Sequence, residues 1–210
     1  MTDHEDESRI ARDLPADAAR AALRRGLIEA RRRPTDPGRH AANEALVERL
    51  GTLLGDLAGE VVAIYWPIRG EPSLGALPER WSRAGARLAL PVVDAPRTPL
   101  RFLEWSPGDP TVPGVWGIPR PAHERALRPT VLVLPCVGFT ADGYRLGYGG
   151  GFYDRSLAVL DADGGPASRT VGVAWDEALL AAFEPLPTDR PLDAVVTPSS
   201  AFLRDRGPAR

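Results

Sequence analysis

Apolar residues recur every three or four positions in the first quarter of the chain, and this spacing predicts two amphipathic helices. The first begins at Pro15 and ends at the segment 34–38, where proline and glycine interrupt the pattern. The second runs from Ala42 and ends near Gly59. Their apolar stripes consist of Ala19, Ala22, Leu23, Leu27 and Ala30 in the first helix, and of Leu46, Leu50, Leu53, Leu54 and Leu57 in the second.

Beyond residue 60 the pattern changes to short apolar runs, several of them rich in β-branched residues, which are typical of strands. Strands that alternate with helices predict a mainly parallel sheet covered on both faces, and in such sheets ligands bind beyond the carboxyl ends of the strands. Residues 106–129 hold six prolines and little periodicity, which predicts a long surface excursion. The predicted strands are 61–65, 87–93, 101–105, 131–134, 170–174 and 194–196, and the predicted helices between them are 73–84, 151–160 and 177–183.

The length of 210 residues allows one α/β domain. We expect it at residues 13–203, between a disordered acidic tail, 1–12, and a short tail, 204–210. Cys136 has no second cysteine for an intrachain disulfide, which favours an inert buried thiol in a reducing, cytoplasmic compartment. The chain shows no secretory signal and no apolar run near the roughly 20 residues of a membrane span. A net charge of −2 argues against a general nucleic-acid binder.

All 26 basic residues are arginine, and the chain contains no lysine. This excludes mechanisms that need a side-chain amine, such as a Schiff base, a pyridoxal phosphate anchor or a Walker-type lysine on phosphate. The three histidines show no metal-ligand spacing. Any phosphate chemistry must therefore use arginine and backbone amides.

The segment 131–155, VLVLPCVGFTADGYRLGYGGGFYDR, carries the clearest chemical signal. A buried strand precedes four glycines within five positions, and a helix follows them. Such glycines let backbone N–H groups converge on an anion, and a helix N-terminus adds partial positive charge. Arg145 can bind phosphate through two hydrogen bonds, and Asp154 could hold a Mg²⁺ ion that bridges nucleotide phosphates. The glycines alone could also serve a tight turn, but the full string is more specific.

That string resembles the hallmark of the 5-formyltetrahydrofolate cyclo-ligase family, R-[LI]-G-x-G-x-G-[FY]-[FY]-D-R, which residues 145–155 match throughout. Arg20, Leu23 and Arg24 are similar to a basic pattern on the family's first helix. Further similar segments follow in family order, so the resemblance covers about residues 18–200. These segments are IYWPIRGEPSL at 64–74, LALPVV, RFLEW, WGIPRP, and PLPTDRPLDAVVT at 185–197.

The resemblance implies an α/β fold, a three-layer α/β/α sandwich with a mainly parallel, Rossmann-like sheet of the NagB/RpiA/CoA transferase type. It implies conversion of 5-formyltetrahydrofolate and ATP into 5,10-methenyltetrahydrofolate, ADP and phosphate, with Mg²⁺ as cofactor. The partners would be ATP and a reduced folate, with no nucleic acid or membrane, in a monomer or weak homodimer. The implied ATP-binding residues are Arg20, Arg24, Arg145, Gly147, Tyr148, Gly149, Gly150, Gly151, Phe152 and Tyr153.

By the same resemblance, Arg145, Tyr153 and Asp154 are the expected catalytic residues. Trp66 and Glu71 would contact the folate, with Trp105 lining the same pocket, and Asp154 and Asp189 would hold Mg²⁺. Taken without the family, Trp66 could be ordinary core packing, Glu71 a surface carboxylate and Asp189 a turn residue.

This chain departs from the family's pattern at several positions. Arg20 and Gly150 stand where relatives have lysine, Arg120 replaces an acidic residue within 117–121, and a glutamine usual after GVAW, 172–175, is not evident. Two alternatives therefore stay open. One is a paralogue that uses the same ATP loop on another small formylated or carboxylated molecule. The other is a noncatalytic nucleotide- or folate-binding module, which could dock RNA through the arginines at 31–33.

Overall fold

A seven-stranded sheet forms the centre of the computed structural model, which describes residues 16–31, 38–166, 168–181 and 183–205. Its strand order is β11-β10-β9-β6-β1-β2-β3. The five inner strands run parallel, and the two edge strands, β11 and β3, run antiparallel to their neighbours. The bounds are β1 Val61–Ala63, β2 Arg87–Val92, β3 Arg101–Glu104, β6 Val131–Pro135, β9 Arg169–Val173, β10 Ala194–Val196 and β11 Ala201–Leu203.

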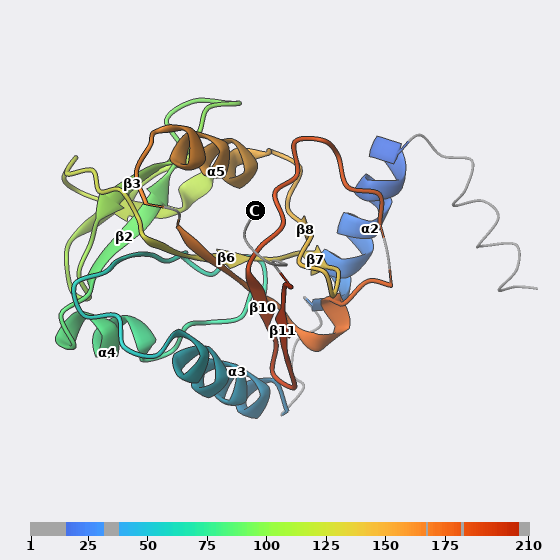
Figure 1. Cartoon of the computed structure of the whole chain (residues 1–210), viewed down its shortest axis with the longest axis horizontal. Helices are drawn as coiled ribbons and strands as arrows, with labels where there is room; N and C mark the ends of the chain where they lie inside the picture. Colours follow the sequence, from blue (N-terminus) through green and yellow to red (C-terminus); the bar gives the residue numbers. More distant parts are fainter. Residues whose placement is uncertain (1–15, 32–37, 167, 182, 206–210) are drawn as a thin grey trace, which may run out of the picture.

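Helices cover both faces of this sheet (Figure 1). Alternate residues of each strand point to opposite faces, so Val131 and Val133 pack with helices α3 and α4, while Leu132 and Leu134 pack with α5. The helices are α2 Ala16–Arg31, α3 Gly38–Leu54, α4 Leu77–Arg83 and α5 Phe152–Ala162. The predicted α/β architecture with a mainly parallel sheet is confirmed.

Several short elements differ from those that the sequence pattern predicts. The segment 106–129 is not only a loop, because it contains strands β4 Thr111–Pro113 and β5 Pro119–Pro121 with the 3₁₀ turn Val115–Gly117 between them. Where a helix is predicted at 177–183, the described residues hold a single 3₁₀ turn at Asp176–Ala178, and residue 182 lies outside the described part of the chain. A small hairpin, β7 Gly138–Phe139 and β8 Arg145–Leu146, is not predicted, because two-residue strands are too short to show a hydrophobic period.

Cys136 follows β6 and is buried, as predicted. Burial away from water raises the pKa of its thiol to about 12, so the side chain stays protonated at neutral pH and packs as a small apolar group. The predicted tail at 1–12 lies outside the described residues. In the described part of the chain, none of the helices combines the length and the apolar character needed to cross a membrane.

Candidate functional site

The glycine-rich segment lies beyond the carboxyl ends of the parallel strands, where the sheet topology predicts a binding site. The chain leaves β6, forms the β7–β8 hairpin, passes through residues 147–151 (the glycine loop) and enters α5. Helix α2 lies beside this hairpin (Figure 1). The loop after β1, residues 64–71, leaves from the same edge of the sheet. Three parts of the chain that are distant in the sequence are thereby brought to one end of the sheet: helix α2, the loop after β1, and the hairpin with the glycine loop that follows it.

Backbone geometry and an arginine from α2 hold the glycine loop in place. Gly149 has φ of 92° and Gly151, the residue before α5, has φ of 63°, which are conformations that glycine adopts without a steric penalty. The Nε of Arg24 donates a 2.8 Å hydrogen bond to the carbonyl of Gly147. The loop leads directly into the N-terminus of the 11-residue helix α5. Free backbone N–H groups and the helix dipole make such a terminus a favourable place for an anion.

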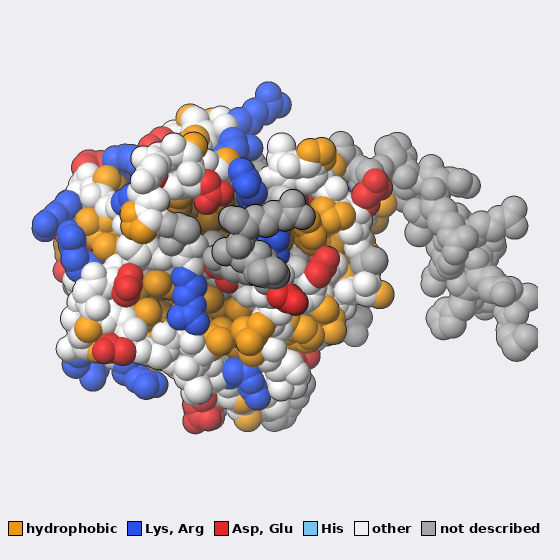
Figure 2. All heavy atoms as spheres, in the orientation of Figure 1, with side chains coloured by type: hydrophobic (Ala, Val, Ile, Leu, Met, Phe, Trp, Pro, Cys, Tyr) orange, Lys and Arg blue, Asp and Glu red, His pale blue; other side chains and the backbone are white. Residues whose placement is uncertain are grey.

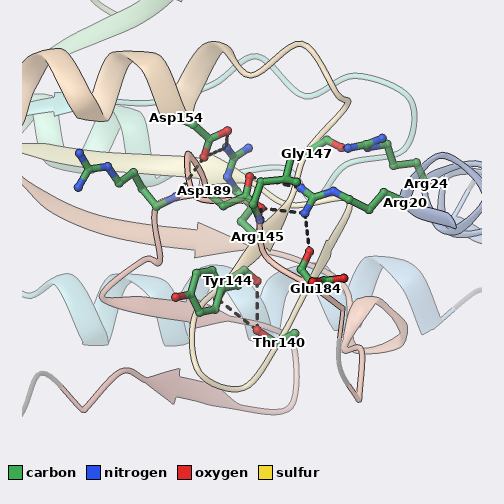
Figure 3. Close-up of polar contacts among 11 residues, drawn as sticks. Arg20, Arg24, Thr140, Tyr144, Arg145, Gly147, Asp154, Glu184 and Asp189 are labelled. Carbon is green, nitrogen blue, oxygen red and sulfur yellow. Dashed lines mark hydrogen bonds and ion pairs between the residues drawn. The ribbon is translucent and has the colours of Figure 1, made fainter. Parts of the chain in front are cut away.

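Arg145 and Asp154 face each other across the start of α5 (Figure 3). Nη2 of Arg145 lies 3.3 Å and 3.2 Å from the two carboxylate oxygens, and the side chains are 5% and 18% exposed. The guanidinium also lies over the ring of Tyr153, with Cζ 5.2 Å from the ring centroid, close enough for a cation–π contact. Burial raises the pKa of Tyr153, which keeps its hydroxyl neutral. These three predicted catalytic residues are thus grouped around one guanidinium.

Arg20 makes a second buried ion pair, with Asp189. Its Nη1 lies 2.8 Å from Oδ2 and its Nη2 lies 3.3 Å from Oδ1, while Nη1 also donates to the carbonyl of Glu184 at 2.9 Å. The two side chains are 7% and 8% exposed. Figure 3 shows the contacts of Arg20 with Asp189 and Glu184. Helix α2 is therefore fastened to the segment that precedes β10.

The two expected Mg²⁺ ligands, Asp154 and Asp189, differ in how tightly hydrogen bonds already hold their oxygens. Both oxygens of Asp189 accept hydrogen bonds from Arg20, and Oδ2 also accepts one from the backbone of Leu186. Both oxygens of Asp154 also accept from Arg145, but its shortest contact, 3.2 Å, is longer than the 2.8 Å bonds at Asp189, and its side chain is more exposed. Within the described ranges no three His, Cys, Asp or Glu side chains form a metal-binding group. Because Mg²⁺ commonly uses one or two carboxylates with water and substrate phosphates, Asp154, whose hydrogen bonds are the longer and weaker ones, fits better as a protein ligand than Asp189, which is held by Arg20 and Leu186.

Glu71 lies buried at the end of the β1 loop and is held from three directions. Its Oε2 accepts a 2.9 Å hydrogen bond from the backbone N–H of Ile68, and its Oε1 accepts a 2.7 Å bond from the hydroxyl of Tyr148. The guanidinium of Arg31 lies 3.8 Å from Oε1 and donates to the Tyr148 oxygen. Burial raises the pKa of the Glu71 carboxyl, and these hydrogen bonds oppose that rise.

The two tryptophans predicted to contact the folate pack together. Trp66 and Trp105 meet edge to face with ring centroids 5.9 Å apart, Trp66 being 37% exposed and Trp105 9%. An exposed indole supported by a buried one can offer a flat face to a ring-shaped ligand. The buried Nε1–H of Trp105 has no hydrogen-bond partner among the residues that the structure describes.

A cleft of about 470 Å³ opens beside the glycine loop. Its lining includes Gly149 and Gly150 of the glycine loop and residues 93–97, which follow β2. Trp116, which is 71% exposed, packs edge to face on Phe152 with centroids 5.7 Å apart. The cleft is large enough to receive part of a drug-sized molecule.

Comparison with known proteins shows which family has this arrangement of residues. The family model described as the 5-formyltetrahydrofolate cyclo-ligase family matches residues 16–198. The chain belongs to the 5-formyltetrahydrofolate cyclo-ligase family. A relative in Mycolicibacterium smegmatis, named 5-formyltetrahydrofolate cyclo-ligase, is 31% identical over 194 residues, which cover 88% of this chain and 96% of that protein. One of the same name in Escherichia coli K12 is 33% identical over 183 residues, or 84% of this chain and 99% of that one.

Solved structures of cyclo-ligase relatives share the fold. The 5,10-methenyltetrahydrofolate synthetase of Aquifex aeolicus superposes with a TM-score of 0.75 at 25% identity, covering 91% of this chain and 95% of its own. The enzyme of the same name from Mycoplasma pneumoniae has a TM-score of 0.68 at 22% identity, covering 85% and 98%. The chain is thus an enzyme of the cyclo-ligase family on the α/β fold expected from its sequence.

The predicted cyclo-ligase site residues form several contacting groups. One joins Arg145, Tyr153 and Asp154; a second joins Arg20 to Asp189; a third joins Glu71 to Tyr148 of the glycine loop; and Trp66 packs on Trp105. Phe152 lies at the cleft, in contact with Trp116.

The sequence analysis assigns no role in the nucleotide or folate site to three residues that the structure brings there. Arg31 belongs to a run of arginines that is typical of a solvated helix end, but it is 6% exposed and bonded to Tyr148. Trp116 lies in a proline-rich segment without periodicity. Arg155 ends the hallmark string, yet its contact with the Gly150 carbonyl depends on the path of the loop.

Proposed function

We propose that this chain is an ATP- and Mg²⁺-dependent enzyme that converts 5-formyltetrahydrofolate into 5,10-methenyltetrahydrofolate, releasing ADP and phosphate. The observation that carries the proposal is the position of Arg145, which is buried beside the glycine loop and aimed at Asp154 in the first turn of α5. Loop amides, a helix N-terminus and a guanidinium all offer positive charge at that point.

The chemistry explains why positive charge is needed. The formyl carbonyl is a poor electrophile, and its oxygen is a poor leaving group. When that oxygen takes the γ-phosphoryl group of ATP, an iminium forms at N5 and phosphate becomes the leaving group. N10 then attacks the former formyl carbon, the carbon–oxygen bond to phosphate breaks, and N10 loses its proton. These reaction steps require no nucleophile from the protein, which suits a chain without lysine.

The residues of this chain would position the substrates and stabilise the transferring phosphoryl group. Arg145 would contact its oxygens, and Arg24 would keep the glycine loop in place through the Gly147 carbonyl. Bound Mg²⁺ would neutralise phosphate charge, with Asp154 as its protein ligand. Glu71 would accept hydrogen bonds from the N–H edge of the pterin, and Trp66 would stack on its ring.

A direct assay with the purified protein tests this function. With ATP, Mg²⁺ and 5-formyltetrahydrofolate, we expect the absorbance of the methenyl product to appear and ADP to accumulate in equal amount. The Arg145→Ala variant should lose at least about 10²-fold in turnover, because an arginine on a transferring phosphoryl group contributes roughly 10³–10⁵-fold.

Arg87→Ala is the matched control. Arg87 begins β2 at the opposite, amino end of the parallel strands and pairs with Glu104 on the surface, so its loss should leave turnover near the wild-type value. Wild-type protein that binds ATP without forming the methenyl product would contradict the proposed substrate and support the paralogue. Full turnover in Arg145→Ala would overturn the role of that arginine.

The cellular setting belongs to the same proposal. A single buried thiol and substrates that are soluble small molecules are consistent with a cytoplasmic enzyme. We expect a monomer or a weak homodimer, which sedimentation of the purified protein at several concentrations would distinguish.

A further inference from the structure

The Glu71 carboxylate is almost completely covered in this structure. Its side chain is only 1% exposed, and that of Arg31 beside it is 3% exposed. The partners that surround it come from different parts of the chain: Ile68 from the same loop, Arg31 from the end of α2, and Tyr148 from the glycine loop. A ligand therefore cannot reach this carboxylate until one of them moves.

Tyr148 is the partner best placed to move. It is 38% exposed, and it belongs to a loop in which Gly149 and Gly151 both adopt positive φ. Its ring lies against two guanidiniums, with the Arg31 Cζ at 5.4 Å and the Arg69 Cζ at 5.5 Å from the ring centroid. Its hydroxyl donates to Glu71 Oε1 at 2.7 Å and accepts from Arg31. Tyr148 thus lies over Glu71 as a polar cover attached to the glycine loop.

The same loop serves two tasks in the proposed function. Its amides would bind the nucleotide phosphates, while its tyrosine covers the carboxylate that would bind the pterin. A nucleotide that draws residues 147–151 toward its phosphates must change the position of Tyr148, since the residue lies between Gly147 and Gly149. The covered and uncovered states of Glu71 therefore differ in how well they bind each substrate.

We propose that Tyr148 is a latch that couples the two substrate sites: it closes over Glu71 when the glycine loop is empty and releases Glu71 when nucleotide binds there. The inference rests on the proposed function for the identity of the two ligands. Binding is consequently cooperative, so nucleotide strengthens folate binding, and by thermodynamic linkage folate strengthens nucleotide binding by the same factor. Tyr148 acts through Glu71 and is a positioning residue.

Binding measurements by calorimetry test the latch. The affinity for 5-formyltetrahydrofolate is measured with and without a nonhydrolysable ATP analogue and Mg²⁺, in wild type and in Tyr148→Phe. In wild type the nucleotide should strengthen folate binding by about 5–150-fold, the usual range of such coupling. Tyr148→Phe keeps the ring but removes the hydroxyl that bonds Glu71, so the coupling factor should fall at least about tenfold or to 1, as expected for one hydrogen bond to a charged group.

Tyr144→Phe is the control. Tyr144 lies in the turn of the β7–β8 hairpin, where its backbone pairs with Thr140, so this variant makes the same chemical change outside the glycine loop. It should keep the wild-type coupling factor. Tyr148→Ala, which removes the cover entirely, should also abolish coupling and raise the folate affinity of the nucleotide-free protein.

Hydrogen exchange provides a readout that needs no folate. The ATP analogue should speed amide exchange in residues 66–71 of wild type, because Glu71, whose Oε2 accepts from the Ile68 N–H, is held less firmly once Tyr148 no longer bonds its Oε1. The analogue should have much less effect in Tyr148→Phe. An unchanged exchange rate in wild type, or full coupling in Tyr148→Phe, would overturn the latch. Failure of the proposed function has a different signature, since the wild-type protein would then form no methenyl product.

Discussion

At the scale of single residues, the site depends on guanidinium groups that do more than supply charge. Arg20 binds both oxygens of Asp189 and a backbone carbonyl, Arg24 binds the Gly147 carbonyl, and Arg31 joins Tyr148 to the carbonyl of Arg69. A planar guanidinium has five donors in fixed directions, whereas an ammonium is a compact point charge. A chain without lysine thus uses its arginines to bind separate segments together.

The Arg20–Asp189 pair gives a stability prediction. Arg20→Lys keeps the charge but cannot reproduce the paired contact with the carboxylate, so it should lower the free energy of unfolding by about 1–2 kcal/mol. Arg20→Met leaves Asp189 buried without its cation and should cost about 3–5 kcal/mol. Urea unfolding of the three proteins measures both differences. Equal stability of the lysine variant and wild type would show that only the charge matters at this position.

The role of a residue can be predicted from the sequence where the residue belongs to a recognisable motif. It cannot be predicted where the role depends on a contact with a residue far away in the chain. Residues 145–154 form a continuous string, so the sequence by itself groups Arg145, Tyr153 and Asp154. It does not identify the partner of Asp189, because Arg20 lies 169 residues away and nothing in either neighbourhood indicates the pairing. The role of Arg31 is hidden for the same reason: its acceptor, Tyr148, is 117 residues distant.

At the scale of elements, the β7–β8 hairpin determines where the glycine loop begins. It turns the chain between β6 and the loop, and its turn is fixed by Gly143, which has φ of 93°. The N–H of Leu192 donates to the Gly143 carbonyl at 2.9 Å, which joins the hairpin to the segment before β10. A Cβ at Gly143 would lie 2.6 Å from the Leu192 carbonyl oxygen.

Alanine substitutions at two glycines with nearly the same φ distinguish the cost of a steric clash from the cost of backbone strain. Gly108 has φ of 94°, and nothing lies within 4 Å of a Cβ added there. Gly108→Ala should cost about 1–2 kcal/mol of unfolding free energy, the strain of a left-handed residue. Gly143→Ala should cost that amount and at least about 1 kcal/mol more, because the backbone of residue 192 must shift. Matching urea midpoints for the two variants would contradict the close approach.

Elements with a full hydrophobic period are predictable, and short exposed ones are not. The predicted bounds of strands β1, β2, β3, β6, β9 and β10 each agree with the structure to within two residues, since their buried runs are continuous. Strand β11 at Ala201–Leu203 is not predicted, because its three residues, although apolar, are too few to show a period of two and are mostly exposed. Helix α4 begins at Leu77 rather than near residue 73, because Pro78 fits the first turn of a helix.

At the scale of the whole molecule, opposite charges are interspersed over the surface. Figure 2 shows arginines and carboxylates mixed on one face, in keeping with 26 basic and 28 acidic residues in the sequence. Exposed pairs of this kind contribute little singly. One exposed pair changes the pKa of its carboxyl group. Arg128 binds both oxygens of Asp163 at 2.8 Å and 2.9 Å, which lowers the pKa of that carboxyl from 3.8 to about 2.

This shift predicts how acid affects the stability of the folded chain. A carboxyl whose pKa is lower in the folded state contributes stability above its unfolded pKa of 3.8, and this contribution is lost as the pH falls toward about 2. The difference in unfolding free energy between wild type and Asp163→Asn should therefore be largest above about pH 5 and shrink steadily below about pH 4. Urea unfolding at several pH values measures it, and a difference that stays constant into the acid range would contradict the Arg128 pair.

The long sequence separation between Arg20 and Asp189 has a consequence for synthesis. A chain that leaves the ribosome from its N-terminus presents helix α2 first, and the residues that fasten this helix, Glu184 and Asp189, emerge 164 and 169 positions after Arg20. Contacts that close such long loops form late, because the chain must lose loop entropy before the contact can stabilise it. The growing chain would therefore remain without this fastening until Asp189 has emerged, so a product that ends before residue 184 would carry the glycine loop but not the segment that holds helix α2.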